Sequence, residues 1–143
     1  MTPLPDAFLR LPIAHRALHD RAKGRPENSH AAIEAACQAG YAIEIDIQPA
    51  ADGVPMVFHD DLLDRLSDQS GEVSERTSDD LAEIRLCGTE ETIPTLEDVL
   101  LRVSGRVPLL IEIKDQGGAP RIGTNTLVEL TLAALSNYKG PVA

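Results

Sequence analysis

Apolar and polar residues alternate along several short stretches of the chain, which is the pattern of half-buried strands. Residues 42–47 read AIEIDI, so that Ile43, Ile45 and Ile47 point to one side of the predicted strand while Glu44 and Asp46 point to the other. Further strands are predicted in the sequences RLPIAH (10–15), PMVFH (55–59) and VPLLIEIK (107–114), and GPVA (140–143) resembles the opening of another.

Segments with helical spacing of apolar residues lie between these strands, and helices are predicted over 28–40, 77–84, 95–105 and 124–138. The first has an Asn or Ser cap and a glycine just past its end, and the third starts with Thr-x-x-Asp. Residues 60–92 are polar and acidic and are expected to be loop apart from the short second helix. The alternation predicts a single α/β domain over 1–143 with a mostly parallel sheet.

The connection between residues 42–47 and 55–59 is too short for a parallel crossover, so these two strands must be antiparallel or unpaired. Asp52 and Gly53 supply a tight-turn signal between them. If they form a two-residue turn, counting outward places His59 opposite Asp46.

The acidic composition narrows the classes of partner. The chain has 143 residues, with 13 Lys and Arg against 23 Asp and Glu, giving a formal charge of -10. Such a charge disfavours binding to nucleic acid or to an anionic membrane surface, and favours a cationic ligand or an anion held through a metal.

The two cysteines, Cys37 and Cys87, give neither a disulfide framework nor zinc-type spacing, and Cys37 is expected in the core. No stretch approaches the roughly 20 apolar residues of a membrane span, and no basic leader is seen, so we expect a cytoplasmic protein without stable membrane insertion.

Residues able to perform chemistry gather at or just past the carboxyl ends of the predicted strands, the edge where parallel sheets and barrels build active sites. The two like charges of Glu44 and Asp46 on a buried strand require a positive partner, and a divalent cation is the simplest one. With Glu112, they would offer the hard oxygen ligands that suit Mg²⁺ or Ca²⁺, and two histidines could serve as acid and base near neutral pH. This chemistry fits phosphodiester hydrolysis. The whole set is His15, Arg16, Glu44, Asp46, His59, Glu112 and Lys114.

Each residue also has a simpler interpretation. If one face of the sheet were wet, the strand carboxylates would merely line it, and Glu112 with Lys114 would form an ordinary ion pair. His19 and His30 are expected to be surface or capping residues rather than ligands. The functional interpretation therefore depends on the coincidence of the set at the strand ends.

The same residues lie in segments that resemble the glycerophosphodiester phosphodiesterase family. The matching pieces occur in the order of the family over nearly the whole chain, and the joint presence of His-Arg, Glu-x-Asp, His-Asp and Glu-x-Lys elements is specific. They read IAHRA, RPENSHAAIEAACQAGY, IEIDIQPAADGVPMVFHDDLLDRLSDQSGEV, IPTLEDVL and LLIEIKD.

The resemblance implies a TIM barrel of the (β/α)8 type found in PLC-like phosphodiesterases, with one divalent cation, Mg²⁺ or Ca²⁺. It implies hydrolysis of a small-molecule glycerophosphodiester to glycerol 3-phosphate and an alcohol. The metal ligands would be Glu44, Asp46 and Glu112, and the general acid and base would be His15 and His59. By the same resemblance, Arg16 and Lys114 would hold phosphate oxygens, and Glu27 and Asn28 would line the mouth of the site.

Two departures from the family pattern affect these expectations. Ala17 stands where the family usually has glycine after His-Arg, which affects substrate fit more than metal binding. A full barrel needs about 250 residues, so the chain is expected to hold roughly the first half, incomplete at its C-terminus.

An exposed sheet edge would then favour a homo-oligomer.

Two alternatives remain open for the function. The chain could be a non-catalytic half-barrel that acts as a metal-binding or oligomerisation module, or a related barrel phosphodiesterase that acts on phospholipid head groups.

Overall fold

A small, mostly parallel sheet forms the centre of the molecule in the computed structural model, which describes residues 4–114 and 126–143. Strand β2 (Ala42–Pro49) is central, with β1 (Ile13–Ala14) parallel on one side and β4 (Leu109–Ile113) parallel on the other. Beyond β4, Val142 makes one further parallel bridge to Leu109. The predicted mostly parallel sheet and the predicted opening of a last strand are therefore confirmed.

The described helices form where the sequence places caps and apolar stripes. Ser29 caps α1 (His30–Ala39), which ends at Gly40, and a capping box of Thr95 and Asp98 starts α3 (Leu96–Val103). Thr126 caps α4 (Leu127–Leu135); the first two residues of that predicted helix, 124 and 125, lie outside the described part. The remaining elements are η1 (Asp6–Leu9), η2 (Arg21–Lys23), η3 (Val73–Glu75) and α2 (Ser78–Ala82).

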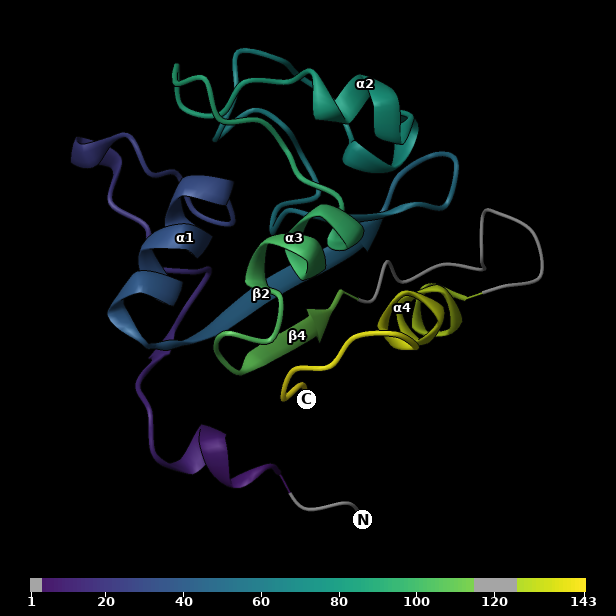
Figure 1. Cartoon of the computed structure of the whole chain (residues 1–143). Coiled ribbons are helices and arrows are strands. Elements are labelled where there is room, and N and C mark those ends of the chain that lie inside the picture. The colour runs from purple at the N-terminus through teal and green to yellow at the C-terminus, as the bar shows by residue number, and fades with distance from the viewer. Residues whose placement is uncertain (1–3, 115–125) are drawn as a thin grey trace.

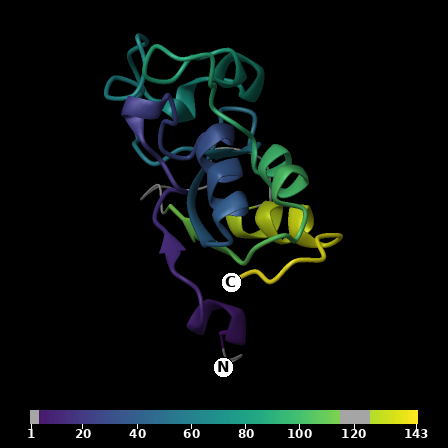
Figure 2. The same cartoon turned by 60° about the vertical axis from the view of Figure 1, so that its left-hand side comes forward.

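The main apolar core lies between the sheet and the helices. The isoleucines Ile43, Ile45 and Ile47 of β2 are fully buried and pack with residues of α1 and α3, including Ile33 and Val99. This arrangement turns the alternate residues of β2, which include both acids, away from the helices. Figures 1 and 2 show α1, α3 and α4 beside the sheet, and α2 at the end where the arrow of β2 points.

The predicted two-residue turn is wrong by one residue. Strand β3 (Pro55–Val57) is antiparallel to β2, as expected, but Ile47 pairs with Val57, and the backbone N–H of Phe58 donates to Asp46 O at 3.1 Å. Phe58 rather than His59 thus lies opposite Asp46. The Ala50 N–H donates to Val54 O at 3.0 Å, so the pair 50/54 encloses a three-residue loop, 51–53, in which Gly53 has a positive φ of 86°.

Residues 60–92 are loop apart from α2 and the short η3, which confirms the predicted loop with one short helix. They leave the sheet near its carboxyl end and fold around a second apolar cluster, in which Phe58, Leu63, Leu81 and Leu86 are almost fully buried. Within the part of the chain that the structure describes, no helix is long and apolar enough to cross a membrane.

Candidate active site at the strand ends

Three carboxylates converge where β2 and β4 run side by side. Asp46 pairs directly with Glu112 in the parallel register, and Glu44 precedes Asp46 on the same face of β2. Oxygen atoms of the three side chains lie within 4.8 Å of one another. Asp46 is 1% exposed and Glu44 7%, whereas the Glu112 side chain remains 55% exposed. The expected grouping of these three residues is therefore present, with one side open to solvent.

Glu44 is buried with only part of its carboxylate satisfied. Its Oε2 accepts a hydrogen bond from the backbone N–H of Arg16 at 2.8 Å, while its buried Oε1 has no hydrogen-bond partner among the described residues. Burial raises the pKa of Glu44; the Arg16 N–H opposes this shift, and the neighbouring charges of Asp46 and Glu112 add to it. An unsatisfied buried oxygen beside two further carboxylates is a chemical fit for a hard cation.

Lys114 supplies positive charge at the open side of the cluster. Its Nζ donates to Glu112 Oε1 at 2.6 Å and lies 3.0 Å from Asp46 Oδ1. Burial alone would lower the pKa of Lys114, but the hydrogen bonds to Glu112 and Asp46 outweigh it and raise the pKa. The lysine therefore stays charged, and it partly neutralises two of the three carboxylates.

Asp46 is held from its other side by the loop before α1 and the loop after β1. Asn28 Nδ2 donates to Asp46 Oδ2 at 3.0 Å, and Arg16 Nε lies 3.7 Å from the same oxygen. Asn28 is itself buried, and its backbone N–H donates to Arg16 O at 2.9 Å. The residues predicted for phosphate binding thus also orient a predicted metal ligand.

Ala17 occupies a backbone position that explains the usual glycine. Arg16 and Ala17 have successive positive φ values of 55° and 64°, in the left-handed region where a Cβ atom is unfavourable. The Ala17 N–H donates to Glu44 O at 3.0 Å, and the residue is 1% exposed. The core accommodates the methyl group of Ala17. Because the backbone has a positive φ there, alanine in place of the usual glycine costs backbone strain.

The two predicted catalytic histidines have different surroundings. His15 Nε2 lies 4.0 Å from Glu44 Oε2, and its side chain is 70% exposed. His59 has its Nδ1 at 2.7 Å from Asp60 Oδ1 and is 30% exposed. The structure therefore brings His15 to the edge of the carboxylate cluster and ties His59 to its own neighbour in the chain.

Asp60 fixes which nitrogen of His59 carries the proton. Hydrogen bonds from Arg65 hold the pKa of Asp60 at about 2, so its carboxylate is ionised at neutral pH and only accepts hydrogen bonds. Neutral His59 must then bear its hydrogen on Nδ1 and leave Nε2 free to accept a proton.

Sequence reasoning missed Asp60 and Arg65. The sequence does contain a signal that could have identified Asp60 as a site residue, because it directly follows a candidate catalytic histidine. Arg65 carries none, because one of its partners, Glu27, lies far away in sequence.

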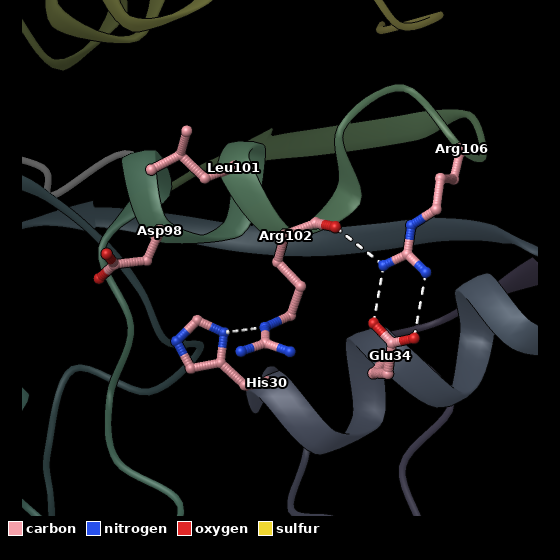
Figure 3. Close-up of a pocket in the computed structure, with 6 residues that line it drawn as sticks. All are labelled: His30, Glu34, Asp98, Leu101, Arg102 and Arg106. Atoms are coloured by element: carbon pink, nitrogen blue, oxygen red, sulfur yellow. Dashed lines mark hydrogen bonds and ion pairs between the residues drawn. The ribbon is translucent and has the colours of Figure 1, made fainter.

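A depression of about 460 Å³ lies in the helical layer and contains none of these residues (Figure 3). Its charged groups pair with one another: Arg106 makes two hydrogen bonds to Glu34, at 3.0 and 2.7 Å, and Arg102 Nε donates to His30 Nδ1 at 3.0 Å. These contacts join α1 to α3, so a structural role accounts for the depression. Its lining residues are His30, Glu34, Asp98, Leu101, Arg102 and Arg106.

The other side chains with simple interpretations lie as expected. His19 is exposed, and His30 is the first residue of α1; burial and the charge of Arg102 lower its pKa. Cys37 is partly buried against the main core. Asp79 and Asp80 are exposed in the first turn of α2.

The chain is similar to proteins that share these segments. Residues 15–139 match the model of the glycerophosphoryl diester phosphodiesterase family. A glycerophosphodiester phosphodiesterase of Bacillus altitudinis is 37% identical over 109 residues, covering 71% of this chain and 43% of that protein. Glycerophosphodiester phosphodiesterase 1 of Mus musculus is 35% identical over 98 residues, covering 62% of this chain and 28% of that protein.

Among solved structures, a phosphodiesterase of Oleispira antarctica in complex with the product sn-glycerol-3-phosphate superposes with a TM-score of 0.78 at 29% identity. The match covers 95% of this chain and 57% of that one. The chain therefore spans about half the length of the proteins that it matches most fully, and the predicted barrel-type α/β fold is confirmed over that span.

Proposed function

Because the chain belongs to the glycerophosphoryl diester phosphodiesterase family, we propose that its strand-end site takes part in metal-dependent hydrolysis of a glycerophosphodiester to glycerol 3-phosphate and an alcohol. The observation that carries this proposal is the convergence of Glu44, Asp46 and Glu112 within 4.8 Å. Support also comes from the related phosphodiesterase whose structure contains sn-glycerol-3-phosphate.

One divalent cation, Mg²⁺ or Ca²⁺, would be held by these three carboxylates, all of which offer hard oxygen donors. The fit rests on the unpartnered buried Oε1 of Glu44 and on the excess of negative charge in the cluster. A cation bound there would neutralise charge that develops on the phosphoryl oxygens. The exposed side of Glu112 gives a small-molecule substrate access to the site.

His59 and His15 would act as the acid and base of the reaction. In its neutral form His59 would leave Nε2 free to accept a proton, because Asp60 accepts the hydrogen on Nδ1. His15 is mostly exposed beside Glu44, so it is free to approach a bound diester. This pair would accept the proton of the attacking water, or of a glycerol hydroxyl that attacks before water, and donate one to the leaving alcohol.

The remaining residues of the site would bind and orient the phosphate. Arg16 and Lys114 each carry positive charge within 4 Å of a carboxylate of the cluster, where a phosphate oxygen could share their donors. Glu27 accepts a hydrogen bond from Arg16 NH1 at 3.0 Å, and Asn28 holds Asp46. We therefore assign Glu27 and Asn28 to the wall of the site.

Release of glycerol 3-phosphate from glycerophosphocholine tests the proposal, measured with Mg²⁺, with Ca²⁺ and with a chelator. Turnover should require metal and should be lost in Asp46→Asn and in His59→Ala. Asp79→Asn, which changes an exposed carboxylate on α2, is the matched control. Absence of metal-dependent turnover in the wild-type chain would count against this activity.

The two alternatives predict other results in the same assay. A non-catalytic half-barrel would bind metal without turnover. A phospholipid head-group phosphodiesterase would act on intact phospholipid and leave glycerophosphocholine untouched.

A further inference from the structure

Arg65 joins two acidic residues that lie far apart in sequence. Its Nε and NH2 groups donate to Asp60 Oδ2 and Oδ1 at 2.6 and 2.9 Å. Its NH1 and NH2 groups donate to Glu27 Oε2 and Oε1 at 3.0 and 2.8 Å. One guanidinium therefore makes two bidentate pairs at once, a geometry that lysine cannot reproduce.

Each acidic partner of Arg65 holds a different residue of the proposed site. Asp60 Oδ1 lies 2.7 Å from Nδ1 of His59, and Glu27 Oε1 accepts a hydrogen bond from NH1 of Arg16 at 3.0 Å. We propose that Arg65 is a positioning residue, which holds His59 through Asp60 and Arg16 through Glu27.

The existing hydrogen bonds of Arg65 leave it few donors for a direct role in binding the substrate. Its four hydrogen bonds use four of the five N–H donors of a guanidinium. The backbone around it is anchored, because Leu63 and Leu66 are 0% and 4% exposed in the second apolar cluster. A fixed backbone and a side chain with most of its donors already used suit a residue that acts by orienting others.

Ionisation keeps the arrangement intact at neutral pH. Arg65 holds the pKa of Asp60 at about 2. Burial alone would raise the pKa of Glu27, but hydrogen bonds from Arg65 and charge from Arg16 hold it below its ordinary value. Both acids are thus charged acceptors at neutral pH.

The test must separate positioning from simple stabilisation of the 60–92 segment. The protein contains four histidines. We would record the ¹⁵N signals of their imidazole nitrogens in the folded protein at neutral pH. In the wild type, neutral His59 should carry its hydrogen on Nδ1. In Arg65→Met, the freed Asp60 side chain should reorient, and the Nδ1–H fraction of His59 should fall.

Arg106→Met is the matched control, because Arg106 also makes a bidentate pair with a glutamate but lies in the helical layer. It should leave the His59 signals unchanged. Arg65→Lys keeps the charge and is the variant to measure if Arg65→Met does not fold. It should also lower the Nδ1–H fraction of His59, but by less. An unchanged Nδ1–H fraction in a folded Arg65 variant would overturn the proposal.

A kinetic measurement adds a readout that rests on the proposed function. With glycerophosphocholine as substrate, Arg65→Met should lower kcat about tenfold or more, a part of what general acid–base catalysis contributes. Arg106→Met should not change kcat, and a kcat in Arg65→Met equal to that of the wild type would contradict a positioning role. If the wild-type chain shows no turnover, the proposed function fails, while the tautomer of His59 still decides the role of Arg65.

Discussion

Asp46 and Glu112 face each other across the parallel strands β2 and β4, and the Nζ of Lys114 lies 3.0 Å from the first carboxylate and 2.6 Å from the second. Direct opposition of like charges on neighbouring strands is unfavourable. The lysine relieves part of this repulsion, but Glu44 remains close to both acids. The cluster therefore retains negative charge that a divalent cation would compensate.

Metal should stabilise the folded chain through this cluster. At a free concentration about 100 times Kd, a bound ion adds about 2.7 kcal/mol, which corresponds to roughly 5–10 °C in melting temperature for a domain of this size. We expect this shift with Mg²⁺ or Ca²⁺ in thermal melts of the wild type and of Asp79→Asn. The shift in melting temperature should be much smaller in Asp46→Asn. If neither ion shifts the melting temperature of the wild type, the carboxylates do not form a metal site.

Stability should fall in acid because of the contact between Asp60 and Arg65. The pKa of Asp60 is depressed from 3.8 to about 2 in the folded state, so its contribution is present above about pH 4 and is lost as the pH falls towards 2. The shift corresponds to roughly 2 kcal/mol. The free energy of unfolding, measured with urea, should fall between pH 4 and pH 2 in both the wild type and Asp60→Asn. The fall should be smaller in Asp60→Asn than in the wild type, by about the same 2 kcal/mol. Parallel pH profiles would contradict the depressed pKa.

Substitutions of Ala17 should report on its left-handed backbone. Ala17→Gly relieves strain of about 1–2 kcal/mol but loses a buried methyl group and adds freedom to the unfolded chain, so stability should change by less than about 1 kcal/mol. Ala17→Val adds a β-branched side chain at positive φ in a buried site, and should destabilise by about 2–4 kcal/mol. Denaturant unfolding measures both, and a valine variant as stable as the wild type would contradict the positive φ.

The apolar face of α4 should favour self-association. Val128 and Leu132 lie one turn apart and are 48% and 63% exposed, so they form a neighbouring apolar pair at the surface. Light scattering at high protein concentration should give a mass above that of the monomer, and Leu132→Lys should reduce it. Leu101→Lys, at a leucine on α3 that is 73% exposed, is the control. A monomer mass at all concentrations would contradict the prediction of an oligomer.

Local patterns in the sequence predicted the elements well, because capping and alternation act over a few residues. Ser29 and Gly40 bound α1, and the alternation in 42–47 placed both acids on one face of β2. The grouping of those acids with Glu112 also followed, since parallel strands bring their carboxyl ends to one edge.

Besides Asp60 and Arg65 in the site, two features of the fold escaped prediction for physical reasons. The hairpin register depends on whether the loop holds two or three residues, and the Asp-Gly pair alone does not distinguish these; the positive φ of Gly53 in a three-residue loop decided it. The second apolar cluster draws on residues such as Leu63, Val73 and Leu86, whose spacing follows neither the helical nor the strand period.

The two apolar clusters separate the chemistry of the site into two mechanical units. The predicted metal ligands stand on strands braced by the main core, through Ile45 and Leu109, whereas His59 and Arg65 follow Phe58 and Leu63 of the second cluster. Arg65 links the two units, because it contacts Glu27, which accepts a hydrogen bond from Arg16 beside the carboxylate cluster. Repacking of the second cluster would therefore disturb His59 directly and the carboxylate cluster only through this link. Mutations in the second cluster should therefore change the proposed proton transfer more than the affinity of the carboxylates for a cation.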